Sequence, residues 1–86
     1  MSSAVTLTAF QRLLLEIVRD KGPCEGIEVI REAKGKGSHA AGGAIYNSLG
    51  HLKEKGCLEV SLRGRRLLYE ITDVGKAALT TSQVTN

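Results

Sequence analysis

Apolar and polar positions along the chain change their period several times, and each change marks a new element. Over residues 9–20 the apolar side chains recur at spacings of three and four, which places them on one stripe of a helix. Thr8 and Gln11 have the spacing of a capping box at the start of this stretch, and Gly22 follows it as a helix-ending residue. The pattern predicts a first helix over residues 9–20.

A second, shorter helix is expected between Pro23 and Gly35. Pro23 would occupy its first turn, because the fixed φ of proline suits that position and no backbone N–H is needed there. Glu25 and Glu28 would then lie near the positive end of the helix dipole, where acidic side chains are favoured.

A third helix is predicted to begin with Ser38 or His39 as its N-cap and to end at Gly56. Its core-facing residues, spaced by four, four and three, are Ala41, Ile45, Leu49 and Leu52. Its opposite face carries Gly42, Gly43, Tyr46, Asn47, Gly50 and Lys53. A glycine inside a helix costs about 1 kcal/mol relative to alanine. This face therefore either packs closely on another helix or receives a ligand close to its backbone.

Residues 58–62 and 67–71 alternate with period two, as half-buried strands do, and the run Arg63-Gly64-Arg65-Arg66 forms a basic turn between them. Thr72 and Asp73 then cap a last helix. The predicted fold is mainly α with a small antiparallel β-hairpin, in the order helix, helix, helix, strand, wing, strand, helix. This is the order of a winged helix-turn-helix. We expect one domain over residues 1–86, with residues 1–7 and 80–86 as flexible tails.

The distribution of charge along the chain indicates a candidate binding surface on this fold. The net charge is +3, but residues 34–66 hold seven basic and two acidic side chains, whereas the segments on either side are each slightly acidic. A basic patch of this kind is the electrostatic footprint of a polyanion-binding surface, and an ordinary solvated surface is the alternative. A domain of 86 residues also has a small core, which a partner subunit would support.

Several other classes of protein are not expected. No apolar run reaches the roughly 18 residues of a membrane helix, and the first residues lack a signal-peptide pattern, so a cytoplasmic, nucleoid-associated protein is expected. Cys24 and Cys57 have no zinc-site spacing to each other or to His39 and His51. We expect two buried or half-buried thiols, with a redox switch or a disulfide as the alternatives. The sequence offers no paired carboxylates and no nucleophile beside a base. No metal, cofactor or enzymatic activity is expected.

Three segments resemble the PadR family of transcriptional regulators. Residues 43–58, GAIYNSLGHLKEKGCL, are similar to the recognition helix of the family and its exit, with Cys57 where an aliphatic residue is usual. Residues 69–79, YEITDVGKAAL, resemble the segment after the wing, and residues 22–30 are similar to the motif of the second helix. The family usually continues into a C-terminal dimerisation helix, and the chain ends at Asn86. The resemblance therefore implies a minimal form, in which a small-molecule effector is not expected.

The leading hypothesis is sequence-specific binding of double-stranded DNA by a small, homodimeric transcriptional repressor. The third helix would enter the major groove, and the wing would contact the backbone or the minor groove. Asn47 has the side chain that pairs with adenine, whereas Tyr46 is either a contact or a packing residue. The candidate DNA-binding residues are Lys34, Lys36, Ser38, His39, Gly43, Tyr46, Asn47, Lys53, Arg63, Arg65 and Arg66.

Two alternatives remain at this stage. A partition or accessory factor would coat repeated DNA sites, and a protein-interaction module would use the third helix without DNA. For the homodimer, the expected interface combines the first and last helices, with candidate residues Leu7, Phe10, Leu14, Ala78 and Leu79.

Overall fold

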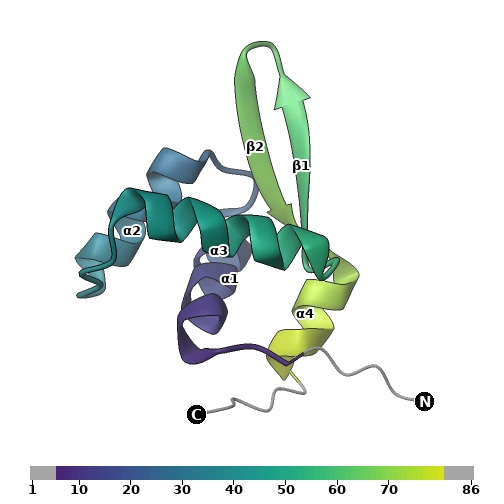
Figure 1. The fold of residues 1–86 in the computed structure, drawn as a ribbon. Helices are drawn as coiled ribbons and strands as arrows, with labels where there is room; N and C mark the ends of the chain where they lie inside the picture. The colour runs from purple at the N-terminus through teal and green to yellow at the C-terminus, as the bar shows by residue number, and fades with distance from the viewer. Residues whose placement is uncertain (1–5, 81–86) are drawn as a thin grey trace.

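The computed structural model describes residues 6–80, which form four helices and one hairpin (Figure 1). The elements in chain order are α1 (Ala9–Lys21), α2 (Gly26–Gly35), α3 (Gly42–Glu54), β1 (Leu58–Arg63), β2 (Arg66–Ile71) and α4 (Asp73–Thr80). The predicted order and the winged helix-turn-helix fold are confirmed.

The predicted capping box of α1 is present. The N–H of Gln11 donates to Oγ1 of Thr8 at 3.0 Å, and the N–H of Thr8 donates to Oε1 of Gln11 at 3.1 Å. At the other end, the N–H of Gly22 donates to the carbonyl of Val18 at 3.0 Å. Both ends of this helix follow from local sequence, because the bonds that make them join near neighbours.

The prediction that Pro23 begins the second helix is wrong. Helix α2 begins at Gly26, with Glu25 as the N-cap, and the N–H of Glu25 donates to Oε2 of Glu28 at 3.0 Å. The chain before it is extended because Cys24 pairs with β2. The N–H of Cys24 donates to the carbonyl of Tyr69 at 3.1 Å, and the N–H of Tyr69 donates back to Cys24 at 2.7 Å. This long-range pairing removes three residues from the expected helix.

The prediction of Ser38 or His39 as the cap of the third helix is also wrong. Ala41 is the N-cap of α3, and Oγ of Ser38 instead accepts a hydrogen bond of 3.2 Å from the N–H of Ala40 within the preceding loop. Ala41 is exposed and not in the core, whereas the three other residues predicted to face inward are buried: Ile45, Leu49 and Leu52.

The two strands form an antiparallel hairpin that projects away from the helices (Figure 1). Its register runs from the pair Leu58 and Ile71 at the base to the pair Arg63 and Arg66 at the tip. Gly64 has φ of 63°, a left-handed conformation that glycine adopts without the steric penalty of a Cβ. Both strands are one residue longer than the sequence predicts at the end that adjoins this turn.

Helix α1 lies at the centre of the core and packs against the other helices and β2. Leu7, assigned to the N-terminal tail by the sequence, is only 1% exposed and belongs to this core. The segment before α1 is held by Lys55, whose Nζ donates to the carbonyl of Thr6 at 2.8 Å and to Oε1 of Gln11 at 3.0 Å. Thr80, with which the C-terminal tail was predicted to begin, is instead the last residue of α4, and residues 1–5 and 81–86 lie outside the described residues.

Thr72 caps α4 as predicted and also anchors it. Its Oγ1 accepts from the N–H of Gly75 at 3.0 Å and donates to the carbonyl of Gly56 at 2.6 Å. Gly75 lies so close to Cys57 that a Cβ there would be 2.4 Å from the carbonyl oxygen. The last helix is therefore fixed against the exit of α3.

The apolar residues that we expected at a dimer interface are used by the monomer itself. Leu7, Leu14, Ala78 and Leu79 are each at most 5% exposed, and only Phe10 of that set is partly exposed. The four buried residues are therefore not available to a dimer interface as we expected, because α1 and α4 pack on each other. Of the helices described between residues 6 and 80, none combines the length and the apolar content that a bilayer crossing requires.

Both cysteines are buried and free, as the sequence predicts. Burial raises the pKa of each thiol, because the thiolate would lose its hydration inside the core. Within residues 6–80, His, Cys, Asp and Glu side chains do not gather in groups of three or more that would hold a metal ion.

Candidate nucleic-acid interface

The outer face of α3 is the first part of the candidate interface. Its buried stripe fixes the orientation of the helix, so the residues on the other side must face solvent. Gly43, Tyr46, Asn47 and Lys53 are all exposed. The structure therefore brings four of the predicted DNA-binding residues onto one accessible helical face.

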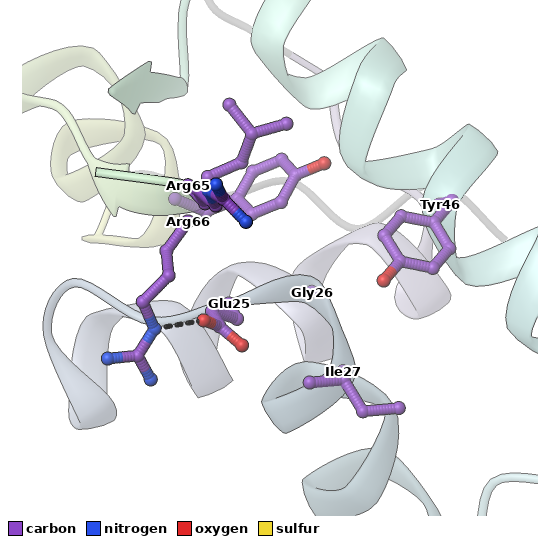
Figure 2. A pocket seen from close by; sticks show the side chains of 8 residues that line it. Glu25, Gly26, Ile27, Tyr46, Arg65 and Arg66 are labelled. Atoms are coloured by element: carbon purple, nitrogen blue, oxygen red, sulfur yellow. Dashed lines mark hydrogen bonds and ion pairs between the residues drawn. The ribbon is translucent and has the colours of Figure 1, made fainter. Parts of the chain in front are cut away.

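Tyr46 has a packing contact as well as an exposed surface. Its side chain is 46% exposed, yet its ring lies so close to Gly26 that a Cβ there would be 2.3 Å from Cε1 and 2.9 Å from the hydroxyl oxygen. Figure 2 shows the ring reaching from α3 toward the start of α2. Both sequence-based interpretations of Tyr46 are therefore compatible with the structure.

Helix packing explains only one of the three glycines in α3. A Cβ at Gly42 would be 3.3 Å from Cδ1 of Ile30, which is a close approach to α2. A Cβ at Gly43 or Gly50 would meet nothing within 4 Å. The described part of the chain gives no steric reason for glycine at these two positions.

The loop before α3 supplies further positive charge. Lys34 lies in the last turn of α2, Lys36 is its C-cap residue, and His39 follows in the loop; all three are exposed. Ser38 is half-buried, and its hydroxyl is engaged by the loop bond to Ala40. The ion pairs found among residues 6–80 do not include Lys34, Lys36 or Lys53.

The wing arginines are exposed but not equivalent. Arg63 and Arg65 take part in none of the ion pairs of the described chain, whereas Nε of Arg66 is bound to Oε2 of Glu25. Arg66 therefore has an acidic neighbour, which its place in the basic turn did not predict. The hydrogen bond to Glu25 raises the pKa of the Arg66 guanidinium. Only two of the three arginines are free to meet a polyanion directly.

A groove of about 250 Å³ lies between the wing and the two helices (Figure 2). Its lining residues come from the start of α2, from α3, and from the hairpin turn and β2: Glu25, Gly26, Ile27, Tyr46, Arg65, Arg66, Leu67 and Tyr69. Burial is the main cause of a raised pKa of the Tyr69 phenol, and Tyr46 adds a smaller contribution. The groove therefore joins three of the predicted residues, Tyr46, Arg65 and Arg66.

Sequence reasoning missed the remaining groove residues. Glu25 was interpreted only as a helix-dipole partner, since 41 positions separate it from Arg66. Leu67 belongs to a strand that was predicted to be half-buried but is itself 53% exposed, because the hairpin extends beyond the core there. The similarity of residues 22–30 to a family motif is the one sequence signal that pointed to this segment.

The exposed third helix and the basic hairpin beside it define a winged helix-turn-helix protein. Residues 14–81 match the model of the transcriptional regulator PadR-like family, and the chain belongs to that family. No curated protein sequence matches the chain.

Solved structures resemble the chain over most of its length. RosR of H. salinarum is 31% identical, with a TM-score of 0.77 over 92% of this chain and 73% of that one. BpsR of Bordetella bronchiseptica, whose DNA binding is regulated by 6-hydroxynicotinic acid, is 28% identical, with a TM-score of 0.73 over 87% and 52% of the two chains. Bacillus subtilis PadR, solved in complex with operator DNA, is 24% identical, with a TM-score of 0.68 over 90% and 50%. The last comparison shows the fold alone.

Proposed function

We propose that this protein binds double-stranded DNA in a sequence-specific manner and acts as a transcriptional regulator. One observation carries the proposal: an exposed polar face of α3 lies beside a wing whose Arg63 and Arg65 have no ion-pair partner in the described chain. A helix and a basic hairpin side by side suit the groove and the backbone of a duplex. Membership of the PadR-like family supports the same function.

In this proposal α3 enters the major groove and reads base edges. Asn47 is the candidate for a bidentate contact with adenine, and the absence of side chains at Gly43 and Gly50 lets the DNA approach the helix closely. Lys34, Lys36 and Lys53 would contact phosphates, which position the protein without reading sequence. Arg63 and Arg65 would contact the backbone or the adjacent minor groove. Tyr46 would present its hydroxyl to the duplex while its ring packs on α2.

We further propose that the regulator is a repressor and that it acts as a homodimer. Two recognition helices related by a two-fold axis would lie about 34 Å apart, one turn of the duplex. The partly exposed Phe10 is the only member of the apolar set named above that still offers surface for such an interface. Sedimentation at micromolar concentrations measures the assembly directly.

Selection of bound duplexes from a random DNA pool tests the function. A palindromic site supports a dimeric regulator, and tandem repeats would indicate a factor that coats repeated sites. In the same selection, Asn47→Ala is expected to relax the preference at one position, with a loss of about 1–3 kcal/mol for the preferred base. No enriched sequence together with salt-insensitive binding would contradict the proposal and favour a protein-interaction module.

A further inference from the structure

One arginine of the wing is held by an acidic residue of a different element. Arg66, at the start of β2, pairs with Glu25, the N-cap residue of α2, across one end of the groove (Figure 2). The Arg66 side chain is 68% exposed and that of Glu25 is 26% exposed. The pair therefore lies at the surface, within reach of any polyanion that meets the wing.

Hydrogen bonds fix the backbone from which the Glu25 side chain extends. The preceding residue, Cys24, forms two hydrogen bonds with Tyr69 of β2, and the N–H of Glu25 itself donates to Glu28. The dipole of α2 also favours a negative charge at this end of the helix. Arg66, in contrast, is bound only through a long, exposed side chain near the hairpin tip. If the pair separates, the Glu25 carboxylate stays tethered to a fixed backbone beside the wing, whereas the longer Arg66 side chain can reach a phosphate.

We propose that Glu25 weakens the phosphate contacts of the DNA interface, because its carboxylate competes with DNA phosphates for the Arg66 guanidinium. This inference rests on the proposed DNA binding. An exposed ion pair contributes little free energy because water screens both charges, so a phosphate can displace the carboxylate. The displaced carboxylate then remains unpaired close to a like charge, which offsets much of the new contact. Arg66 therefore adds less to DNA binding than Arg63 or Arg65 does.

The consequence is that phosphate contacts contribute less to the affinity for DNA. Phosphate contacts supply essentially all of non-specific DNA binding, whereas base contacts add the discrimination between sites. A carboxylate that withholds one arginine and repels the backbone lowers the affinity for every sequence. It leaves the base contacts of α3 unchanged, so these contacts supply a larger share of the affinity for the correct site.

The test removes the charge of Glu25 and keeps its shape. Glu25→Gln is titrated with a duplex of arbitrary sequence at several salt concentrations, with fluorescence anisotropy as the readout. We expect affinity to rise about two- to five-fold, the range of a surface ion pair. The plot of log affinity against log salt should steepen by up to about 0.9 as Arg66 becomes a full phosphate contact. Glu70→Gln, on the exposed side of β2, is the matched control for a lost negative charge, since Glu70 takes part in none of the ion pairs of the described chain.

A second comparison uses the arginines themselves, first in the wild-type background and then in the Glu25→Gln background. In the wild-type background, Arg65→Ala should reduce the salt slope by about 0.9 and Arg66→Ala by clearly less. In the Glu25→Gln background, the two arginine variants should become equal. Thermal unfolding of each variant shows that the fold is retained.

The inference is overturned if Glu25→Gln weakens DNA binding, since Glu25 would then position Arg66 on a phosphate. Equal effects of Glu25→Gln and Glu70→Gln, or equal slopes for the two arginine variants in the wild type, would also overturn it. A wild-type protein with no salt-dependent DNA binding is a different result, because it would remove the proposed function together with this inference.

Discussion

The ring of Tyr46 lies directly against Gly26, so that the first residue of α2 and the outer face of α3 are in contact. A Cβ at Gly26 would be only 2.3 Å from Cε1 of the ring. The contact lies in the groove that faces the wing, and it fixes the orientation of an otherwise exposed side chain. The position of α2 is thereby linked to the surface that is proposed to meet DNA.

Gly26→Ala should therefore displace the Tyr46 ring. A steric clash of this kind lowers the free energy of unfolding by about 1–3 kcal/mol where the neighbours cannot move. The higher helix propensity of alanine offsets up to about 1 kcal/mol of that loss. Because the ring is partly exposed and can turn away, we expect a net loss of about 1 kcal/mol, measured by urea unfolding. The loss should vanish in the Tyr46→Ala background. A full loss in that background would mean that the contact is not its cause.

Alanine at Gly50 should stabilise the protein and weaken its binding to DNA. Nothing lies within 4 Å of a Cβ built there, and the position is inside α3, so the gain should be about 0.5–1 kcal/mol. If the DNA backbone or a base edge approaches this face, the added methyl group will lower affinity. Unfolding and DNA titration of the same variant separate the two effects. Unchanged affinity would mean that Gly50 serves no DNA contact.

Lys53 and Lys55 should show opposite behaviour although only one residue separates them. Lys55→Gln removes hydrogen bonds to Thr6 and Gln11 and should reduce the free energy of unfolding by about 1 kcal/mol. Lys53 takes part in none of the ion pairs of residues 6–80, so Lys53→Gln should change stability by less than about 0.5 kcal/mol. It should instead reduce the salt slope of DNA binding by about 0.9. A loss of stability in Lys53→Gln with an unchanged salt slope would contradict the placement of Lys53 at the interface.

The two buried thiols should make the protein less stable in mild alkali. Burial raises the pKa of Cys24 and Cys57 above their usual value of 9.0, so the unfolded chain ionises first as pH rises. Below the usual thiol pKa, the neutral thiols make their full contribution to the free energy of unfolding. That contribution is lost as the pH rises through and above this value. The urea concentration at the midpoint of unfolding should therefore decrease as the pH is raised from about 8 to about 10. In the Cys24→Ala, Cys57→Ala double variant the fall should be smaller, and an equal fall would assign it to other groups.

Local patterns predicted most of the fold because the contacts that fix several of the helix ends are short in sequence. The capping box of Thr8 and Gln11, the stripe of Ile45, Leu49 and Leu52, and the cap at Thr72 all follow from spacing. The start of α2 did not, because the pairing of Cys24 with Tyr69 joins residues that are far apart in the chain. Local propensity alone would let Pro23 begin a helix.

The sequence predicted where the candidate site lies, but it did not predict which side chains contact each other there. The segregation of positive charge and the polar face of α3 are visible in the sequence. The ion pair of Glu25 with Arg66 and the contact of Tyr46 with Gly26 depend on how α2 packs against the wing and α3. Neither pair has a sequence spacing that would indicate contact.

The central claim is that α3 and the wing together form a DNA-binding face, and the salt dependence of duplex binding tests it most directly. Affinity for DNA would be measured over a range of salt concentrations for the wild type and for the Arg63→Ala, Arg65→Ala double variant. Arg19→Ala, which removes a charge paired with Asp20 on α1, serves as the control. The account predicts weaker binding of every sequence and a slope reduced by about 1.8 in the double variant, with the control unchanged. An unchanged slope in the double variant would contradict it.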